Sequence, residues 1–212
     1  MATSTNMILH FTRYPHPGKC KTRLMPALSA EKAAQIHRQL VHHSDKTITS
    51  YLTRFSDTTY HIHYTGASLK EMNQWLGDRK FTKQQGEDLG QRMANALRTA
   101  ISCCDKCVLM GSDCPDITEE LLQNAFTALQ KNDIVLGPAY DGGYYLIGIN
   151  KTLSPKDLKQ LFTAIPWGGE MVLAKTLERI QELHLSFRLL EKLHDIDTPD
   201  DLQYFNHHSH AE

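Results

Sequence analysis

The sequence predicts an α/β protein in which helices pack on a mostly parallel sheet. Short apolar runs alternate with longer amphipathic segments along the chain, which is typical of strands joined by crossover helices. A length of 212 residues with 41% hydrophobic residues is enough to bury one sizeable core. We therefore expect a single domain that spans residues 1–212.

The first half of the chain is expected to hold three strands and three helices. The strands are short and lie at residues 7–12, at residues 60–64 and around Phe81. A long helix begins after Ser29, which is placed to cap it, and continues through Ile48. Ser68 and Glu71 form a capping box at a short helix that ends near residue 76, and a third helix is expected over residues 89–101.

The second half repeats this alternation with one exception. Strands are predicted at residues 108–110, 134–136 and 144–149, an apolar run follows at 187–190, and a helix begins near Thr118. The gap between residues 136 and 144 is too short for a helical crossover, so it predicts a bend or antiparallel pairing. Ser154-Pro155 and Thr198-Pro199 each predict an N-cap followed by proline at the first helical position. The polar tail, residues 207–212, is expected to fray.

Charge and hydropathy exclude several classes of function. The formal net charge is −1, which gives no global attraction to nucleic acid. No apolar run reaches the roughly 20 residues needed to cross a bilayer, and residues 1–6 are too short and polar for a signal peptide. We expect a soluble cytoplasmic protein.

The five cysteines favour a reducing compartment, because an odd number does not suit a disulfide framework. Cys104 and Cys107 have the C-x-x-C spacing of a zinc or redox site, with Cys103 adjacent. Neither a second C-x-x-C nor a suitably spaced histidine pair follows. Free thiols are the expected state, and a zinc or redox module is the weaker alternative.

The segment LMGSDCPD at residues 109–116 is an apolar strand that stops abruptly and presents carboxylates at its end. In open α/β sheets, ligands bind beyond the carboxyl ends of the strands, so Asp113 would lie where a metal or a phosphate can be reached. The alternative is that Ser112 and Asp113 only shape a turn or cap the helix that follows.

A basic, proline-containing loop directly follows the first strand. Around Gly18 it places four cations within eleven positions, namely Arg13, Lys19, Lys21 and Arg23. Such cations form strong, directional hydrogen bonds to phosphate. The spacing matches neither a Walker A loop nor the G-x-G-x-x-G fingerprint. The loop either binds the phosphates of a nucleotide or is a solvated surface loop.

Two further acidic segments come later in the chain. Asp141-Gly142-Gly143 follows a strand, and its paired glycines allow close approach to a ligand or an ordinary turn. Asp195-Ile196-Asp197 precedes a helix start, where acidic residues are stabilised without any metal. Asp113 and Asp197 could share a divalent cation if their segments are neighbours, and hard oxygen ligands would suit Mg²⁺ or Mn²⁺.

Two polar or aromatic loops complete the candidates. Residues 85–92 could offer amide and backbone groups to a base, although a simple helix-capping loop explains them equally well. Trp167 lies in a glycine-containing loop, where it could stack on a substrate or act as a lid, with core packing as the competing explanation. None of the twelve histidines is assigned a role.

Taken together, four motifs resemble, in order, a family of small bacterial GT-A-like transferases that includes glycosyltransferases of the arsenosugar-biosynthesis type. The motifs are residues 14–24 (YPHPGKCKTRL), 111–115 (GSDCP), 141–145 (DGGYY) and 195–199 (DIDTP). The family is similar to molybdenum-cofactor guanylyltransferase and phospholactate guanylyltransferase, and the resemblance spans residues 7 to about 204. It implies a Rossmann-like three-layer sandwich of the nucleotide-diphospho-sugar transferase type.

The resemblance also implies roles for particular positions. Arg13, Lys21 and Arg23 would belong to the phosphate loop, and Gln85 with Gly90 would lie near the base. Asp113 and Asp197 would bind Mg²⁺ or Mn²⁺, and Asp141 with the glycines after it would form the acceptor-side loop. With the residue patterns included, the candidate catalytic residues are Asp113, Asp141 and Lys21. The candidate nucleotide-binding residues are Arg13, Gly18, Lys21, Arg23, Gln85 and Gly90, and the candidate acceptor-binding residues are Gly142, Gly143, Tyr144 and Trp167. The family often has Ser and Thr after the Pro-Trp pair, whereas Gly168 and Gly169 stand here, which removes hydroxyl contacts to an acceptor.

The leading hypothesis is therefore a metal-dependent glycosyltransferase that uses a nucleotide-sugar donor and a small-molecule acceptor. Such catalysis needs carboxylates for the metal and cations for the phosphates, with no protein nucleophile. The first alternative is nucleotidyl transfer from a nucleoside triphosphate to a phosphorylated small molecule. The second is a non-catalytic protein that binds a nucleotide, since fold alone does not imply function.

Overall fold

A seven-stranded sheet forms the centre of the molecule in the computed structural model, which describes residues 5–206. The strand order is β3-β2-β1-β4-β6-β5-β7. In chain order the strands are β1 (Asn6–Arg13), β2 (Thr58–Thr65), β3 (Phe81–Lys83), β4 (Lys106–Met110), β5 (Ile134–Pro138), β6 (Tyr144–Asn150) and β7 (Phe187–Leu189). The predicted strands are thereby confirmed, and the polar tail at 207–212 lies outside the described residues.

The sheet is mostly parallel, as predicted. β1 pairs in parallel with β2 and β4, β2 with β3, and β5 with β7. β6 is the reversed strand and pairs antiparallel with both β4 and β5. The short connection between β5 and β6 therefore makes a hairpin, because too few residues are available for a crossover helix.

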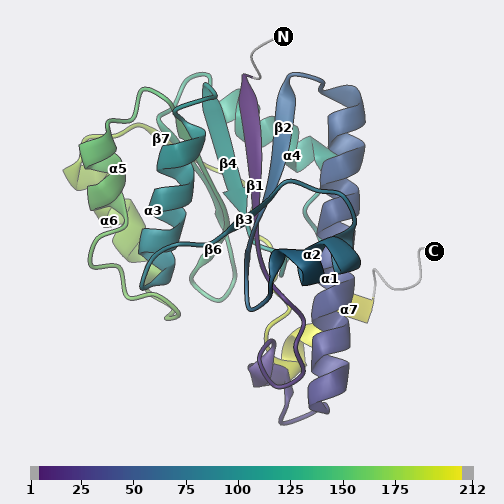
Figure 1. Cartoon of the computed structure of the whole chain (residues 1–212). Helices are drawn as coiled ribbons and strands as arrows, with labels where there is room; N and C mark the ends of the chain where they lie inside the picture. Colours follow the sequence, from purple (N-terminus) through teal and green to yellow (C-terminus); the bar gives the residue numbers. More distant parts are fainter. Residues whose placement is uncertain (1–4, 207–212) are drawn as a thin grey trace.

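Helices cover both faces of the sheet, which gives the three layers of the predicted sandwich (Figure 1). They are α1 (Ala30–Arg54), α2 (Leu69–Leu76), α3 (Leu89–Ala100), α4 (Glu119–Ala128), α5 (Pro155–Leu161), α6 (Val172–Glu182) and α7 (Leu202–Asn206). Residues of α1, α2 and α4 share one buried cluster with Ile8 and Val108. Residues of α3, α5 and α6 share the other with Leu9 and Leu109. Successive residues of a strand therefore pack into clusters on opposite faces of the sheet, because side chains along a strand alternate between the two faces.

Most helix starts follow the capping chemistry in the sequence. The hydroxyls of Ser29, Ser68, Thr118 and Ser154 each accept a hydrogen bond from a backbone N–H in the first turn. Thr198-Pro199 instead begins a short 3₁₀ turn, Pro199–Asp201, that leads into α7. α6 was not predicted, and its N-cap, Met171, makes no side-chain capping bond. Within the described residues, no helix is both long and apolar enough to span a membrane.

This topology sets where a ligand can bind. The parallel strands β1, β2, β3 and β4 all end at one edge of the sheet, at Arg13, Thr65, Lys83 and Met110. The loops that follow these strands carry the basic segment and Asp113. Ligands of open α/β sheets bind at such an edge.

Candidate active site

The Lys21 ammonium lies between two carboxylates that are far apart in the sequence. Its Nζ is 2.7 Å from Asp113 Oδ1 and 3.8 Å from Asp197 Oδ1. The same Nζ donates a hydrogen bond to the Ile196 carbonyl at 2.6 Å. Only 2% of the Lys21 side chain is exposed. The two predicted metal ligands and a predicted phosphate-loop lysine therefore meet at one point.

Backbone geometry explains why these segments meet. The Ile196 N–H donates to the Asp113 carbonyl at 2.8 Å, and the Ile196 side chain is fully buried. This places Asp195 and Asp197 on either side of an anchored residue, beside the loop after β4. Lys21 itself has φ 49°, in the left-handed region that non-glycine residues rarely occupy. Such a residue persists only where its surroundings hold it, and strain of this kind clusters at functional sites.

Electrostatics keep Asp113 ionised. Burial of its Oδ1 opposes the charge, but Lys21 and His37 outweigh this effect and hold the pKa of Asp113 below its ordinary value. His37 Nδ1 lies 3.9 Å from Asp113 Oδ1. About 45% of the Asp113 side chain remains exposed, so one side of the carboxylate is open to a ligand.

Asp195 is the acidic residue whose contribution sequence reasoning missed. Burial and the neighbouring carboxylates of Asp141 and Asp113 raise its pKa to about 7. The Cys114 thiol donates a weak hydrogen bond to Asp195 Oδ1 at 3.6 Å. The D-x-D spacing was a usable signal, because it brings both carboxylates to the same site when the residue between them is anchored. A raised pKa among like charges marks a place where added positive charge is stabilising.

The basic loop faces these carboxylates, as the sequence hypothesis required. Arg23 donates to Asp197 Oδ2 at 2.9 Å, while 60% of its side chain stays exposed. Arg13 donates to the Lys19 carbonyl at 2.9 Å, which fixes its guanidinium against the loop. A cavity of about 270 Å³ lies here, and its lining includes Asp113 together with all four loop cations. We refer to it as the phosphate cavity.

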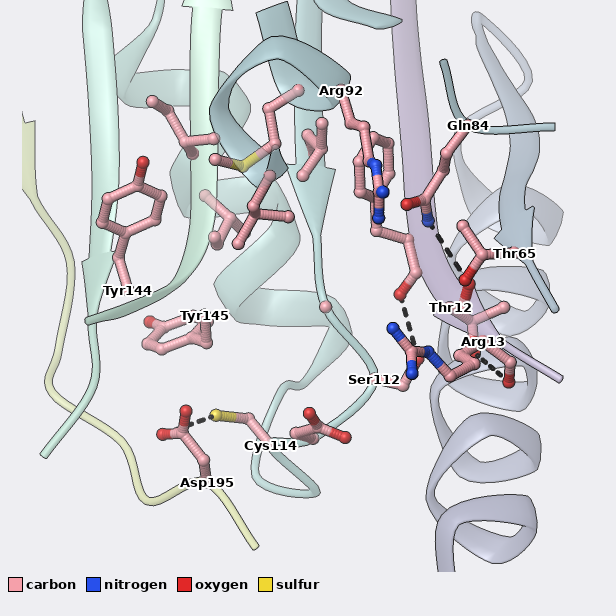
Figure 2. Close-up of a pocket in the computed structure, with 18 of the residues that line it drawn as sticks. Thr12, Arg13, Thr65, Gln84, Arg92, Ser112, Cys114, Tyr144, Tyr145 and Asp195 are labelled. Atoms are coloured by element: carbon pink, nitrogen blue, oxygen red, sulfur yellow. Dashed lines mark hydrogen bonds between the residues drawn. The ribbon is translucent and has the colours of Figure 1, made fainter. Parts of the chain in front are cut away.

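A larger hollow of about 330 Å³, the main cleft, adjoins the phosphate cavity at Arg13 and Asp113. Figure 2 shows its labelled side chains, which come from the ends of β1 and β2, from the loops after β3 and β4, from α3, from β6 and from the segment that carries Asp195. Gln84 crosses one wall, and its Nε2 donates to the carbonyls of His63 and Thr12. This cleft has the size of a small-molecule site and a few convergent polar groups.

A buried polar chain that was not predicted from the sequence supports the loop that carries Asp113. Ser112 Oγ is 3.0 Å from His10 Nε2, and His10 Nδ1 is 3.0 Å from the Tyr60 hydroxyl. Tyr60 donates to Asp45, which also binds Arg79. Burial lowers the pKa of His10 to about 4, so the imidazole is neutral at pH 7. The chain positions Ser112 beside the candidate ligand Asp113.

Several predicted nucleotide-binding residues lie outside the main cleft. Gln84 lines it, whereas Gln85 lines a different cavity. Gly90 is buried under Trp167, and a Cβ at Gly90 would meet the indole at about 2.6 Å. Gly18 adopts φ 76° and shapes the turn of the basic loop, and it lines neither the main cleft nor the phosphate cavity. These glycines act through backbone geometry and close packing.

The predicted acceptor residues are likewise divided. Tyr144 lines the main cleft, but Trp167 packs against Phe162 and Tyr144 and does not line it. This arrangement corresponds to the core-packing alternative for Trp167. Asp141 Oδ1 accepts from the Gly143 N–H at 2.8 Å, so it stabilises the hairpin turn. Asp141 also lines a third cavity with Asp195, Asp197 and Arg23.

The cysteine segment contains no evident metal centre. All five cysteines are free thiols, as predicted. Within the described residues, no group of three or more His, Cys, Asp or Glu side chains is arranged to hold a metal ion. Any metal at Asp113 and Asp197 must therefore take further ligands from a substrate or from water.

Comparisons with known proteins agree with this architecture. Residues 48–169 match the family described as "Uncharacterized protein conserved in bacteria (DUF2064)". No curated protein matches the chain significantly. A crystal structure of a proposed nucleotide-diphospho-sugar transferase from Desulfovibrio desulfuricans G20 shares 37% sequence identity and superposes with a TM-score of 0.86. The match covers 99% of this chain and 89% of that one.

More distant structures share the fold at low identity. The 4-diphosphocytidyl-2C-methyl-D-erythritol synthase from Anaerococcus prevotii DSM 20548 has 11% identity and a TM-score of 0.60, covering 98% of this chain and 97% of that one. A CMP:2-keto-3-deoxy-manno-octonic acid synthetase complexed with CTP has 11% identity and a TM-score of 0.59, and the match covers 97% of this chain and 98% of that one. At such identities the likeness establishes the fold alone.

Proposed function

We propose that this chain, which belongs to the DUF2064 family, is a metal-dependent transferase that acts as a single cytoplasmic domain on a nucleotide-activated donor. The observation that carries the proposal is the position of the Lys21 ammonium, 2.7 Å from Asp113 and 3.8 Å from Asp197, beside a loop rich in cations. Cations for phosphate and carboxylates for a metal are the parts that such a reaction needs.

The donor set fits Mg²⁺ or Mn²⁺. The side chains of Asp113 and Asp197 are 45% and 35% exposed, so both carboxylates can reach an ion that binds beside the Lys21 ammonium. Burial and the neighbouring carboxylates raise the pKa of Asp195 to about 7, which favours added positive charge here. Magnesium is commonly bound by one or two carboxylates together with substrate phosphates. When bound, the ion would neutralise charge on the donor phosphates.

The protein's own groups then have distinct tasks. Arg13, Lys19 and Arg23 would bind the phosphates from the phosphate cavity, where their charges already converge. Lys21, fixed by its buried contacts, would stabilise the negative charge that develops on the leaving phosphate. The main cleft would hold the nucleoside, with Gln84 and Arg92 among its polar walls.

Glycosyl transfer from a nucleotide sugar is our leading assignment. It is supported by the D. desulfuricans protein described as a proposed nucleotide-diphospho-sugar transferase, which shares 37% identity over nearly the whole chain. The four sequence motifs further favour a glycosyltransferase of the arsenosugar-biosynthesis type. We assign the acceptor to the side of Asp141 and Tyr144, where Gly168 and Gly169 supply no hydroxyl groups.

Nucleotidyl transfer is the second candidate, of the guanylyltransferase-like kind indicated by the motif resemblance. Four cations line the phosphate cavity, which provides positive charge suited to a triphosphate as well as a diphosphate. The acceptor would then carry a phosphate of its own.

Product analysis distinguishes the two reactions. The purified protein is incubated with Mn²⁺, a panel of nucleotide sugars or nucleoside triphosphates, and sugar or sugar-phosphate acceptors. Release of nucleoside diphosphate supports glycosyl transfer, and release of pyrophosphate supports nucleotidyl transfer. The Asp113→Asn variant should lose at least about 100-fold in rate, as expected when a charged group at the reaction centre is removed. Unchanged turnover in this variant would reject the assignment of Asp113.

A further inference from the structure

A second cavity of about 340 Å³ lies on the sheet face that carries α3, away from Asp113. Its floor is formed by side chains of β1 and β2, and its sides by β3 and α3. The residues that line it are Met7, Leu9, His61, His63, Thr82, Lys83, Gln85, Arg92, Asn95, Ala96, Arg98, Thr99, Ala100 and Cys103. We call it the second cavity. Its volume is at the lower end of the range for small-molecule sites.

The lining of the second cavity is positively charged and contains no carboxylate. Lys83, Arg92 and Arg98 contribute three cations from β3 and α3. In the part of the chain that the structure describes, none of the three forms an ion pair. Three uncompensated cations around one concave surface concentrate positive potential there.

Hydrogen bonds hold two of these cations in place. Arg98 donates from Nη2 to Asn95 Oδ1 at 3.1 Å, and the Asn95 amide in turn donates to the Gln85 carbonyl at 2.9 Å. Arg92 donates from Nε to the Gly86 carbonyl at 3.0 Å. Each arginine uses only part of its five-donor fork in these contacts. The remaining N–H groups are available to a ligand without a large ordering cost.

The two histidines add polar groups but no charge. Burial lowers the pKa of His63 to about 4 and also lowers the pKa of His61, so both rings are neutral at pH 7. His63 stacks on Phe11 at 5.5 Å between ring centroids. Phe11 lines the main cleft and His63 the second cavity, so this pair forms the wall between them, and Arg92 lines both spaces.

We propose that the second cavity binds a phosphorylated small molecule at a site separate from the donor and metal site. A phosphate group matches the lining because it carries up to two charges and accepts several hydrogen bonds from guanidinium forks. Hydroxyls of Thr82 and Thr99 lie among the cations and would act as additional partners. The inference does not depend on the proposed transferase reaction, because it rests on the charge of a different cavity.

Calorimetric titration with sodium pyrophosphate in metal-free buffer tests this site. The double variant Lys83→Glu, Arg98→Glu reverses two exposed charges of the second cavity and leaves the phosphate cavity intact. The matched control, Lys70→Glu with Lys156→Glu, makes the same change in net charge at exposed positions in the first turns of α2 and α5. Thermal unfolding verifies that each variant is folded, and Arg98→Ala serves as a milder substitution.

We expect the parent and the control to bind pyrophosphate at the second cavity, and the Lys83→Glu, Arg98→Glu variant to bind there at least about tenfold more weakly. Arg23→Glu, which perturbs the phosphate cavity, should leave this binding in place. The proposal is overturned if pyrophosphate does not bind the parent, or if the double variant binds it as tightly as the parent does, whatever the result for Arg23→Glu. Nucleotide binding with Mn²⁺ is measured on the same samples, so failure of the transferase assignment would be seen separately.

Discussion

Lys21 shows how the site balances its charges. A buried ammonium next to two carboxylates is stable only because each charge has a partner, and the left-handed φ of 49° indicates that the loop is held against its own preference. The positive charge is therefore in position before any phosphate arrives. Preorganised charge of this kind lowers a reaction barrier without reorganisation at the moment of reaction.

Replacing Lys21 by methionine should weaken binding of a nucleotide donor by about 10- to 100-fold, the effect of losing one charge-assisted hydrogen bond. It should also destabilise the fold by about 1 to 3 kcal/mol at pH 7, because Asp113 loses its partner. This destabilisation should shrink as the pH falls below the ordinary aspartate pKa of about 3.9, because the pKa of Asp113 in the folded parent is lowered and its pairing with Lys21 is lost only in acid. Calorimetry at pH 7 and denaturant unfolding at pH 7 and at about pH 3 measure these effects. Lys70→Met is the control, because Lys70 is an exposed lysine of α2 that does not line the phosphate cavity.

Asp195 should make the folded protein less stable as the pH rises, which is opposite to the effect of Asp113. Its pKa is raised to about 7, so the folded protein holds this proton more tightly than the unfolded chain. The contribution of protonated Asp195 to the free energy of unfolding is fully present below about pH 4 and is lost as the pH rises through about 7. In metal-free buffer, Asp195→Asn should be more stable than the parent at pH 8, and the difference should disappear near pH 4. Equal stability of the two proteins at pH 8 would contradict this account.

Asp78→Asn is the control for that experiment, because Asp78 is exposed and lies away from the site. It removes the same charge without removing a crowded carboxylate. We expect it to follow the stability of the parent across the same pH range.

Individual residues also mark the limit of what the sequence could predict. The convergence of Asp113, Asp197 and the basic loop followed from strand ends and motif order. The contacts of His10 with Ser112 and Tyr60 did not, because they depend on the register of β1 against β2 and β4. A buried histidine has no local signature in a single sequence, and the choice between Gln84 and Gln85 likewise depends on which way each side chain points.

At the scale of elements, the hairpin between β5 and β6 is tied to the start of α6. The Leu173 N–H donates to the Gly142 carbonyl at 2.9 Å. Gly142 has φ 89°, and a Cβ there would lie 2.0 Å from the Glu170 carbonyl oxygen. The loop that carries Asp141 is therefore positioned by a neighbouring helix through a contact that only glycine allows.

Gly142→Ala should consequently destabilise the protein by about 2 kcal/mol or more, from backbone strain and the displaced segment at Glu170. Gly111→Ala is the matched control, because a Cβ at Gly111 meets nothing within 4 Å. Urea unfolding of both variants measures the difference. If Gly142→Ala were as stable as Gly111→Ala, the hairpin would not be held in this way.

Strands and capped helices were predictable because their signals are local. Ser29, Ser68 and Ser154 cap the helices that their sequence context indicated. α6 escaped prediction because its first turn contains no acidic residue and its N-cap makes no side-chain bond. Its apolar face becomes recognisable only in the structure, where Ile180 is buried in one core cluster and Leu173 and Leu177 pack against it. Tertiary packing rather than capping defines this helix.

At the scale of the whole molecule, the reversed strand β6 determines how the site is assembled. It lies between β4 and β5, so the hairpin with Asp141 emerges at the same edge as the loop with Asp113. The segment after β7 carries Asp195 and Asp197 to that same edge. An isolated parallel β-bridge between Ala139 and Leu193 holds this segment beside the end of β5. The short β5–β6 gap predicted a bend or antiparallel pairing, but only the strand order shows that β6 is inserted between β4 and β5.

A ligand that bridges these segments should stabilise the molecule as a unit. A donor nucleotide with Mn²⁺ at about 100 times its dissociation constant should add about 2.7 kcal/mol to the free energy of unfolding. A scanning thermal unfolding experiment would show this as a higher Tm in the presence of both donor and metal. The Asp197→Asn variant should show little of the increase, since it lacks one of the two proposed metal ligands.

The central claim is that Asp113, Asp197 and the basic loop form one site for a metal and a nucleotide-activated donor. Calorimetric titration of the parent and of Asp113→Asn with nucleotide sugars and nucleoside triphosphates, with and without Mn²⁺, tests it most directly. We predict that at least one donor binds the parent in a Mn²⁺-dependent manner and that Asp113→Asn abolishes this binding. Absence of metal-dependent binding throughout the panel, or equal binding by the variant, would contradict the claim.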